Sequence, residues 1–332
     1  MFSRAGRIFS THPGLFFFNF LEIALIAWWL ARGSLSTEDW FVDNECQNPE
    51  WQDTVWDGYD DAVKAAEVAY DYIMEIRTSV QYSRARHQLS PRQKRTLNIF
   101  ETIYGKTLFD RRDPDYRQAG AQAYRRFDKI LASLNDDNPQ AIAHYHMFCD
   151  DDMFVPFLVD PQGQDWVLDT RPVRDGGGTV VNIHGTCDND GTANVLSYSW
   201  KAPYGRHYQT AYCPDWVEHW ERYGALSAYR DSRGRSVPVL RGTIHITQIA
   251  LSFMTPSVLH ELTHSQDILG NDVLGDQDCM GRGVGGYGWP CITFLAQNHP
   301  DLAAKNADNF AYLVTALYLD YADWRDGLGL RD

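Results

Sequence analysis

The pentapeptide His-Glu-Leu-Thr-His at residues 260–264 constrains the fold more than any other feature of the chain. On an α-helix, a spacing of four residues places both imidazoles on one face, one turn apart, within reach of a common metal ion. The surroundings are typical of a helix, because Thr255 can cap it, Pro256 suits its first turn and Gly270 can end it. Glu261 then lies beside the first ligand, where it can reach a metal-bound water as general base. We therefore expect a zinc-binding helix.

The third metal ligand must come from outside this pentapeptide, because a catalytic zinc takes three protein ligands and leaves one position open for water. No glutamate follows Glu261, and the position six residues after His264 that would carry a third histidine is Gly270. An aspartate therefore remains. Asp267 would lie one turn beyond His264, whereas Asp272 follows the expected chain reversal and can swing back toward the metal. We favour Asp272, and the alternatives are Asp276 and Asp278.

The first 33 residues have the pattern of an export signal. Arg4 and Arg7 precede an apolar run at 15–30, and the small residues Ala31 and Gly33 follow it. Basic, apolar and small residues in this order predict a signal peptide cleaved near Gly33, and hence a secreted, extracellular protein. The alternative is an uncleaved signal anchor, because a run of this length nearly spans a bilayer if it is tilted. Only in that case do we expect contact with a membrane.

Cysteine usage and charge agree with export. All six cysteines lie after the apolar run, and an even number in an exported chain predicts up to three disulfides. We expect Cys279 and Cys291 to form one of them. The formal net charge of −14 at pH 7 leaves no electrostatic footprint for a polyanion, so no nucleic-acid partner is expected.

The periodicity of apolar residues predicts an α+β chain with no internal repeat. Residues 1–33 form the signal, 34–140 a helical N-terminal portion and 141–332 the catalytic portion. Helical patterns lie at 51–76, 95–109, 117–134, 213–229, after Ser257 and at 301–321. Strand patterns lie at 144–148, 166–168, 179–183 and 195–200, and a further strand is expected around His245, before the metal-binding helix.

Four segments between residues 245 and 320 resemble the aspzincins, the deuterolysin and peptidyl-Lys metallo-endopeptidase group of mostly secreted fungal enzymes. They are the pentapeptide itself, Gly-Asn-Asp at 270–272, Tyr-Gly-Trp-Pro-Cys at 287–291 and Asn-Ala-Asp-Asn-Phe at 306–310. The resemblance implies a zincin-like metalloprotease domain in which His260, His264 and Asp272 hold one Zn²⁺ per chain and Glu261 is the catalytic base. It also implies that Tyr287 donates to the oxyanion and that Asp308 contributes to substrate binding.

The chain departs from the aspzincin pattern at three places. The segment at 270–272 is one residue shorter than its family counterpart, and a glycine-rich insert separates Asp272 from Tyr287. Ala311 stands where the lysine-specific members carry a glutamate. Asp308 alone makes a weaker acidic pocket, so strict lysine specificity is not expected.

The function predicted from these residues is zinc-dependent endopeptidase activity, with proteins or peptides as substrates and a metal-activated water as nucleophile. One alternative is an exported interaction protein with a degenerate protease fold that binds a partner without cutting it. Another is a metal-dependent hydrolase of a non-peptide substrate. Zinc content and casein cleavage separate the three, because the endopeptidase alone combines about one zinc per chain with cleavage.

Overall fold

The computed structural model describes thirteen parts of the chain. They are residues 40–42, 45–49, 51–81, 88–105, 125–131, 145–161, 165–172, 177–182, 187, 196–201, 208–234, 244–279 and 287–329. The expected signal at 1–33 lies outside the described residues. Among those that are described, no helix combines the length and the apolar character needed to cross a bilayer.

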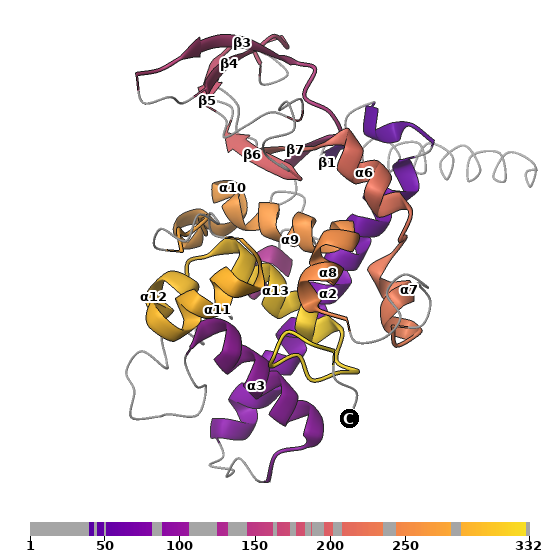
Figure 1. Ribbon diagram of the computed structural model, residues 1–332, viewed down its shortest axis with the longest axis vertical. Coiled ribbons are helices and arrows are strands. Elements are labelled where there is room, and N and C mark those ends of the chain that lie inside the picture. The colour runs from indigo at the N-terminus through magenta and orange to yellow at the C-terminus, as the bar shows by residue number, and fades with distance from the viewer. Residues whose placement is uncertain are drawn as a thin grey trace, which may run out of the picture.

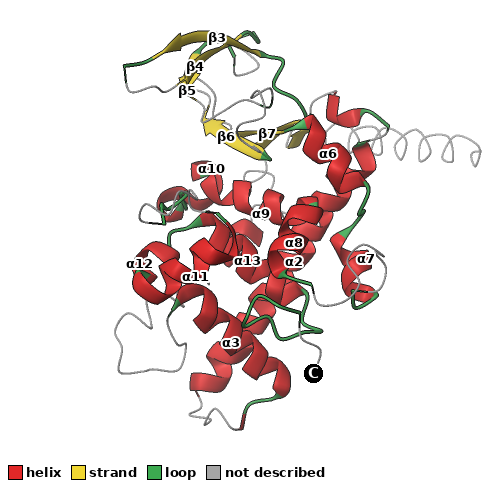
Figure 2. Cartoon of the chain, viewed as in Figure 1, coloured by secondary structure: helices red, strands yellow, loops and turns green. Residues whose placement is uncertain are grey.

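The molecule consists of a helical body with two small sheets at one end (Figures 1 and 2). The α+β class expected from the sequence is therefore confirmed. The longer helices are α2 (Gln52–Gln81), α3 (Pro91–Tyr104), α6 (Pro214–Glu221), α9 (Met254–His264), α11 (Gly288–Asn298) and α13 (Ala307–Tyr318). The short ones are η1 (Glu45–Gln47), α7 (Leu226–Asp231), α8 (Ile246–Ser252), α10 (Gln266–Leu269), η5 (Gly270–Asp272) and α12 (Pro300–Ala303), and residues 125–131 are also helical.

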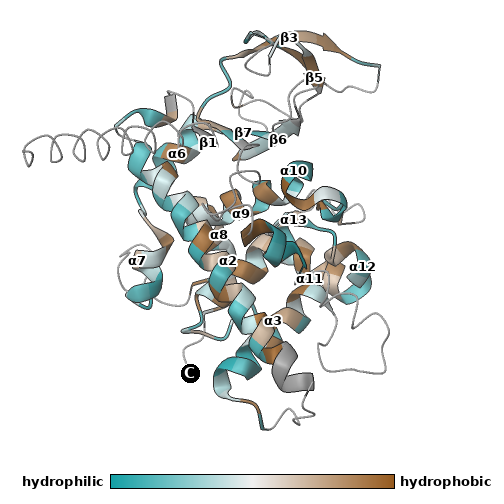
Figure 3. Ribbon diagram, turned by 180° about the vertical axis from the view of Figure 1, so that it is seen from behind, coloured by the Kyte–Doolittle hydropathy of each residue, from teal (hydrophilic) through white to brown (hydrophobic). Residues whose placement is uncertain are grey.

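Helices α2, α9 and α13 pack against one another at the centre of the body. Four alanines of α2 are fully buried, and side chains this small allow the neighbouring helices to approach closely. Every residue of α13 is buried, and α9 exposes only its last residue to any extent. In Figure 3 hydrophobic residues gather on the helices that pack together, α8, α9 and α11 among them. The pentapeptide helix is thus a core element of the fold.

A four-stranded sheet covers one end of this body and lies above α9 in Figure 1. Its strand order is β1 (Trp40–Val42), β2 (Tyr145–Phe148), β7 (Tyr208–Tyr212) and β6 (Ser197–Lys201). The first three strands are parallel to their neighbours, and β6 is antiparallel to β7. Strand β6 also contacts α9. The sheet therefore places β6 beside the pentapeptide.

The second sheet is a three-stranded antiparallel meander. It contains β3 (Phe154–Val159), β4 (Asp165–Asp169) and β5 (Val180–Asn182). A separate apolar cluster lies between the two sheets, and its members include Phe148, Phe154, Val167, Tyr198 and Trp200. Alternate residues of β6 therefore face this cluster, which leaves the residues between them to face α9.

Four local expectations are wrong. The helix expected at 301–321 is two helices, α12 and α13, separated by a turn at 304–305. The helix expected at 213–229 is two helices, because Gly224 adopts a left-handed φ of 69° between α6 and α7. The strand expected around His245 is the start of α8, where the His245 Nδ1 accepts a hydrogen bond from the backbone N–H of Thr247 at 3.1 Å. Helix α9 begins at Met254 without a side-chain cap and ends at His264, so Gly270 ends α10 instead.

Three disulfides staple the described chain. They join Cys46 to Cys149, Cys187 to Cys213 and Cys279 to Cys291. The expected pairing of Cys279 with Cys291 is confirmed. The Cys46–Cys149 bridge ties the N-terminal portion of the chain to the end of β2.

Candidate metal centre

Two imidazoles and one carboxylate converge at the C-terminal end of α9. The Nε2 atoms of His260 and His264 are 3.1 Å apart. The Oδ1 atom of Asp276 lies 3.2 Å from the His260 Nε2 and 3.6 Å from the His264 Nε2. Ligand atoms placed about 2.05 Å from a tetrahedral zinc are about 3.3 Å from one another. The three atoms therefore have the spacing that a shared zinc requires.

Hydrogen bonds to the opposite side of each ring fix which nitrogen faces this centre. The His260 Nδ1 is 2.8 Å from Asp308 Oδ1, and the His264 Nδ1 is 3.0 Å from the carbonyl oxygen of Leu274. Carboxylate and carbonyl oxygens only accept, so Nδ1 is the donor in both bonds, and in the neutral ring Nε2 keeps its lone pair. Three acceptor atoms in mutual contact repel one another unless a cation lies between them. The chemistry of these donors therefore fits a metal ion.

Asp276 takes the place in this centre that we expected for Asp272. The Asp272 carboxylate is 2.7 Å from the Lys129 ammonium, and this contact lowers the pKa of the carboxyl below its usual value. Lys129 also bonds the carbonyl oxygen of Leu269, and Arg126 bonds the backbone carbonyl of Asp272 itself. The helical segment 125–131 thus holds Asp272 away from the imidazoles. The structure therefore brings Asp276, one of the two alternatives, to the imidazoles in place of Asp272.

Asp276, four residues after Asp272, reaches the centre because the segment after η5 is extended along the end of α9. The Leu274 N–H bonds the Thr263 carbonyl at 2.9 Å, and the Gly275 N–H bonds the Lys305 carbonyl at 3.0 Å. Gly275 also forms an isolated parallel bridge with Asn306, at the start of α13. These backbone contacts bring the Asp276 carboxylate to the Nε2 atoms of the two rings.

Asp308 lies beside His260, and both of its oxygens form hydrogen bonds within the fold. One of its oxygens accepts from the His260 ring, and the other accepts from the Gly288 N–H at 2.6 Å. The residue is 9% exposed, and both of its side-chain oxygens are engaged. These bonds place Asp308 behind the His260 ring, and its expected role in substrate binding stays a prediction. Outer carboxylates of this kind fix the tautomer and rotation of a metal-binding histidine.

The protonation behaviour of His260 reflects these two carboxylates. Burial favours its neutral ring, but hydrogen bonds with Asp276 and Asp308 outweigh burial and raise the pKa of the imidazole well above 6.5. Burial also opposes ionisation of Asp276, yet its contacts with the histidines lower the pKa of that carboxyl to about 2. A proton and a metal ion therefore compete for the same place, and Asp276 is anionic at neutral pH.

The remaining expected residues lie around the centre. Glu261 is 3% exposed, and the Ser197 hydroxyl of β6 donates to its Oε1 at 2.8 Å. The Tyr287 hydroxyl donates to Asp276 Oδ2 at 3.0 Å, and its ring centroid is 5.8 Å from that of His260. The structure thus brings together His260, His264, Glu261 and Tyr287, four of the residues named from the sequence.

Tyr208 on β7 is a site residue that the sequence analysis missed. Burial, with the nearby carboxylates of Glu261 and Asp276, raises the pKa of its phenol above the usual value. The same influences raise the pKa of the Tyr287 phenol. Both phenols therefore keep their protons at neutral pH and can act as donors. Tyr208 is 53 residues before Glu261 in the chain, so no local pattern indicated it.

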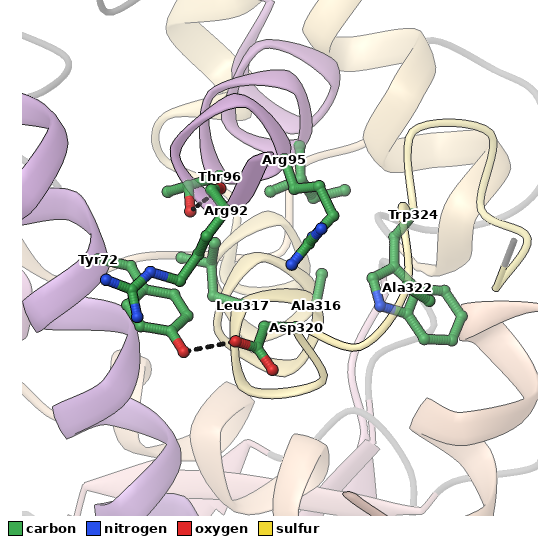
Figure 4. Close-up of a pocket in the computed structure, with 10 residues that line it drawn as sticks. Tyr72, Arg92, Arg95, Thr96, Ala316, Leu317, Asp320, Ala322 and Trp324 are labelled. Carbon is green, nitrogen blue, oxygen red and sulfur yellow. Dashed lines mark hydrogen bonds between the residues drawn. The ribbon is translucent and has the colours of Figure 1, made fainter. Parts of the chain in front are cut away.

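A second feature, the small cavity of Figure 4, lies away from the metal centre. It is bounded by α2, α3 and the end of α13, and its volume is about 10 Å³, room for about one water molecule. The Tyr72 hydroxyl donates to Asp320 Oδ2 at 2.6 Å across it, and Arg92 lies over the Tyr72 ring. The hydrogen bond across this cavity joins α2 to the end of α13, and none of the metal-centre residues lines the cavity.

Comparisons with known proteins add little to this geometry. No protein-family model matches the chain, and no curated protein matches it. A solved structure described as a zinc peptidase from Grifola frondosa superposes with a TM-score of 0.34 at 15% identity, over 77% of this chain and 93% of that one. A score this low establishes neither a common fold nor a common function.

Proposed function

We propose that the protein is a zinc-dependent endopeptidase. The observation that carries the proposal is the triangle of His260, His264 and Asp276, with Glu261 next to it on the same helix. Among the described residues, this is the group of His, Cys, Asp and Glu side chains close enough together to hold a metal ion. When bound there, zinc would lower the pKa of a water molecule and polarise the scissile carbonyl.

Glu261 is the general base in this proposal. It takes a proton from the attacking water while the water oxygen bonds to the carbonyl carbon, and it passes that proton to the amine as the carbon–nitrogen bond breaks. The protonated phenol of Tyr287 is held beside Asp276 and is the donor to the oxyanion, and Tyr208 of β7 lies near Glu261 and Asp276 as a second phenol. Asp308 keeps the His260 Nε2 directed at the centre.

A peptide is the substrate that best suits the surroundings of this helix. Among the described strands, β6 is paired on one side only, with β7, and it lies against α9. An extended peptide can add to such an edge through main-chain hydrogen bonds, which hold it independently of its side chains. The edge lies next to Glu261, since Ser197 of β6 bonds that carboxylate. We therefore propose that extended protein segments are cut here.

The three disulfides favour an extracellular place of action, because such bridges persist in oxidising compartments. With the export signal expected at 1–33, they support a secreted enzyme.

The test is the Glu261→Gln variant of the full chain, assayed for casein cleavage and zinc content. We expect cleavage to fall at least about 100-fold while about one zinc per chain remains, because the base is lost and the ligands are kept. Glu218→Gln is the matched control, because it makes the same change on the exposed side of α6 and should leave both values unchanged.

Three results would contradict the proposal. Cleavage by Glu261→Gln at the wild-type rate would show that Glu261 is not the general base. A wild-type protein with zinc and no casein cleavage would indicate a non-peptide substrate. A protein with neither zinc nor cleavage would indicate an interaction protein with a degenerate site.

A further inference from the structure

Both carboxylate oxygens of Glu261 are engaged by hydroxyls of one strand. Ser197 Oγ donates to Oε1 at 2.8 Å, and Ser199 Oγ donates to Oε2. A carboxylate only accepts, so each serine directs its single proton at Glu261. The general base therefore has a fixed partner for each oxygen.

The alternation of β6 explains why both hydroxyls reach α9. Ser197 and Ser199 are two residues apart, so they share one face of the strand. Tyr198 and Trp200 point the other way, into the apolar cluster between the two sheets. The large buried rings fix the register of β6, and this register presents the two serines to α9.

A third hydroxyl extends the arrangement to the next strand. Thr210 of β7 lies opposite Ser199 in the sheet, is fully buried, and has its Oγ1 2.5 Å from Ser199 Oγ. Since the Ser199 proton is directed at Glu261, Thr210 must be the donor in this bond. The three groups form a chain of hydrogen bonds that runs from Thr210 through Ser199 to Glu261, and each bond in such a chain polarises the next.

We propose that Ser197, Ser199 and Thr210 are positioning residues that hold the Glu261 carboxylate in the orientation needed for proton transfer. The inference rests on the proposed function, in which Glu261 is the base. A buried carboxylate without these donors would be costly and would turn toward other partners, and a misplacement of about 1 Å can reduce a rate about 100-fold. The hydroxyls therefore act on the chemical step through the geometry of Glu261.

The first experiment separates this role from simple support of the fold. Ser199→Ala should lower kcat about tenfold, while KM and the zinc content of about one per chain stay at wild-type values. Ser199→Thr restores the hydroxyl and should recover most of kcat. Ser232→Ala is the control, because it removes a serine hydroxyl that bonds the Tyr229 carbonyl on α7, far from β6 along the chain, and should leave kcat unchanged.

The second experiment does not depend on activity. Ser199→Ala should lower the Tm by roughly 3–8 °C, because a buried charged acceptor loses a donor. In a Glu261→Met background, which has no carboxylate, the same substitution should lower the Tm far less. This non-additivity measures the Ser199–Glu261 interaction directly.

The two experiments have distinct failures. Equal Tm effects of Ser199→Ala in both backgrounds would show that Ser199 and Glu261 do not interact, and would overturn the inference whether or not the protein is a peptidase. If the Tm effects differ but Ser199→Ala retains wild-type kcat, the contact is structural only and the positioning role is overturned. A wild-type protein without peptidase activity would instead refute the proposed function and with it the positioning role, while the Tm comparison would still report on the contact.

Discussion

The replacement of Asp276 by asparagine, compared with the same change at Asp272, tests the geometry of the centre most directly. Both residues are aspartates of one short segment, and both substitutions remove one negative charge. Asp276 Oδ1 is within 3.2–3.6 Å of both histidine Nε2 atoms, whereas Asp272 is paired with Lys129. The two variants should therefore separate cleanly in metal binding.

The expected losses of zinc affinity in the two variants differ by more than an order of magnitude. Loss of an outer partner of a zinc ligand weakens binding about 10–100-fold, so loss of the anionic ligand itself should weaken it more than about 100-fold, or about 2.7 kcal/mol. Asp272→Asn breaks a partly exposed ion pair, which contributes about 0.2–1 kcal/mol to the free energy of unfolding and nothing to the metal.

Zinc affinity is measured by competition with a chromogenic chelator, and the free energy of unfolding by urea titration. The reasoning fails if Asp276→Asn binds zinc as tightly as the wild type, or if Asp272→Asn is the variant that loses the metal. His260→Ala serves as the positive control for metal loss. If all three variants have the far-UV circular dichroism spectrum of the wild type, unfolding is not the cause of the metal loss.

Three further predictions concern the same region and its supports. Asp308→Asn should weaken zinc binding about 10–100-fold, because the amide holds the His260 ring less well; wild-type affinity in the chelator assay would contradict this. Zinc affinity should fall about tenfold for each unit that the pH is lowered below the raised pKa of His260, because the ring must lose a proton to bind metal. A zinc affinity that does not change between pH 6 and 7 would show that no proton on His260 competes with the metal. The same protonated ring stabilises the metal-free protein below pH 6.5, and this stabilisation is lost as the pH rises through the raised pKa. Replacing Cys279 and Cys291 by serine should lower the free energy of unfolding by about 3 kcal/mol, because the bridge closes a loop with a sequence separation of 12; an unchanged urea midpoint would argue against the loop-closure account.

The N-terminal helices pose a separate question for the function, namely whether they can be removed as a prosegment. Helix α2 packs against both α9 and α13, and its alanines are buried in the same core as Leu259 and Leu262. Removing it would expose the apolar faces of the helices that carry the metal centre. A segment this deeply packed is expected to remain with the mature protein.

Several features of the molecule could be predicted from local sequence because local geometry decides them. The spacing of His260 and His264 fixes their common face on any helix. The Cys279–Cys291 bridge and the α+β class also followed from short-range patterns. Errors arose where a glycine or a tertiary contact ended an element, as at Gly224, and where a histidine capped a helix instead of entering a strand.

The sequence by itself determined that two imidazoles and the Glu261 carboxylate would lie on one helix, because the period of the helix depends only on the backbone. Only the tertiary structure decided which aspartate joins them, since Lys129 holds Asp272 and the backbone pairing of Gly275 with Asn306 delivers Asp276. The same is true of Asp308, Ser197 and Ser199, which reach the helix from other elements. Contacts between segments distant in sequence depend on how the elements pack, and no local periodicity encodes that packing.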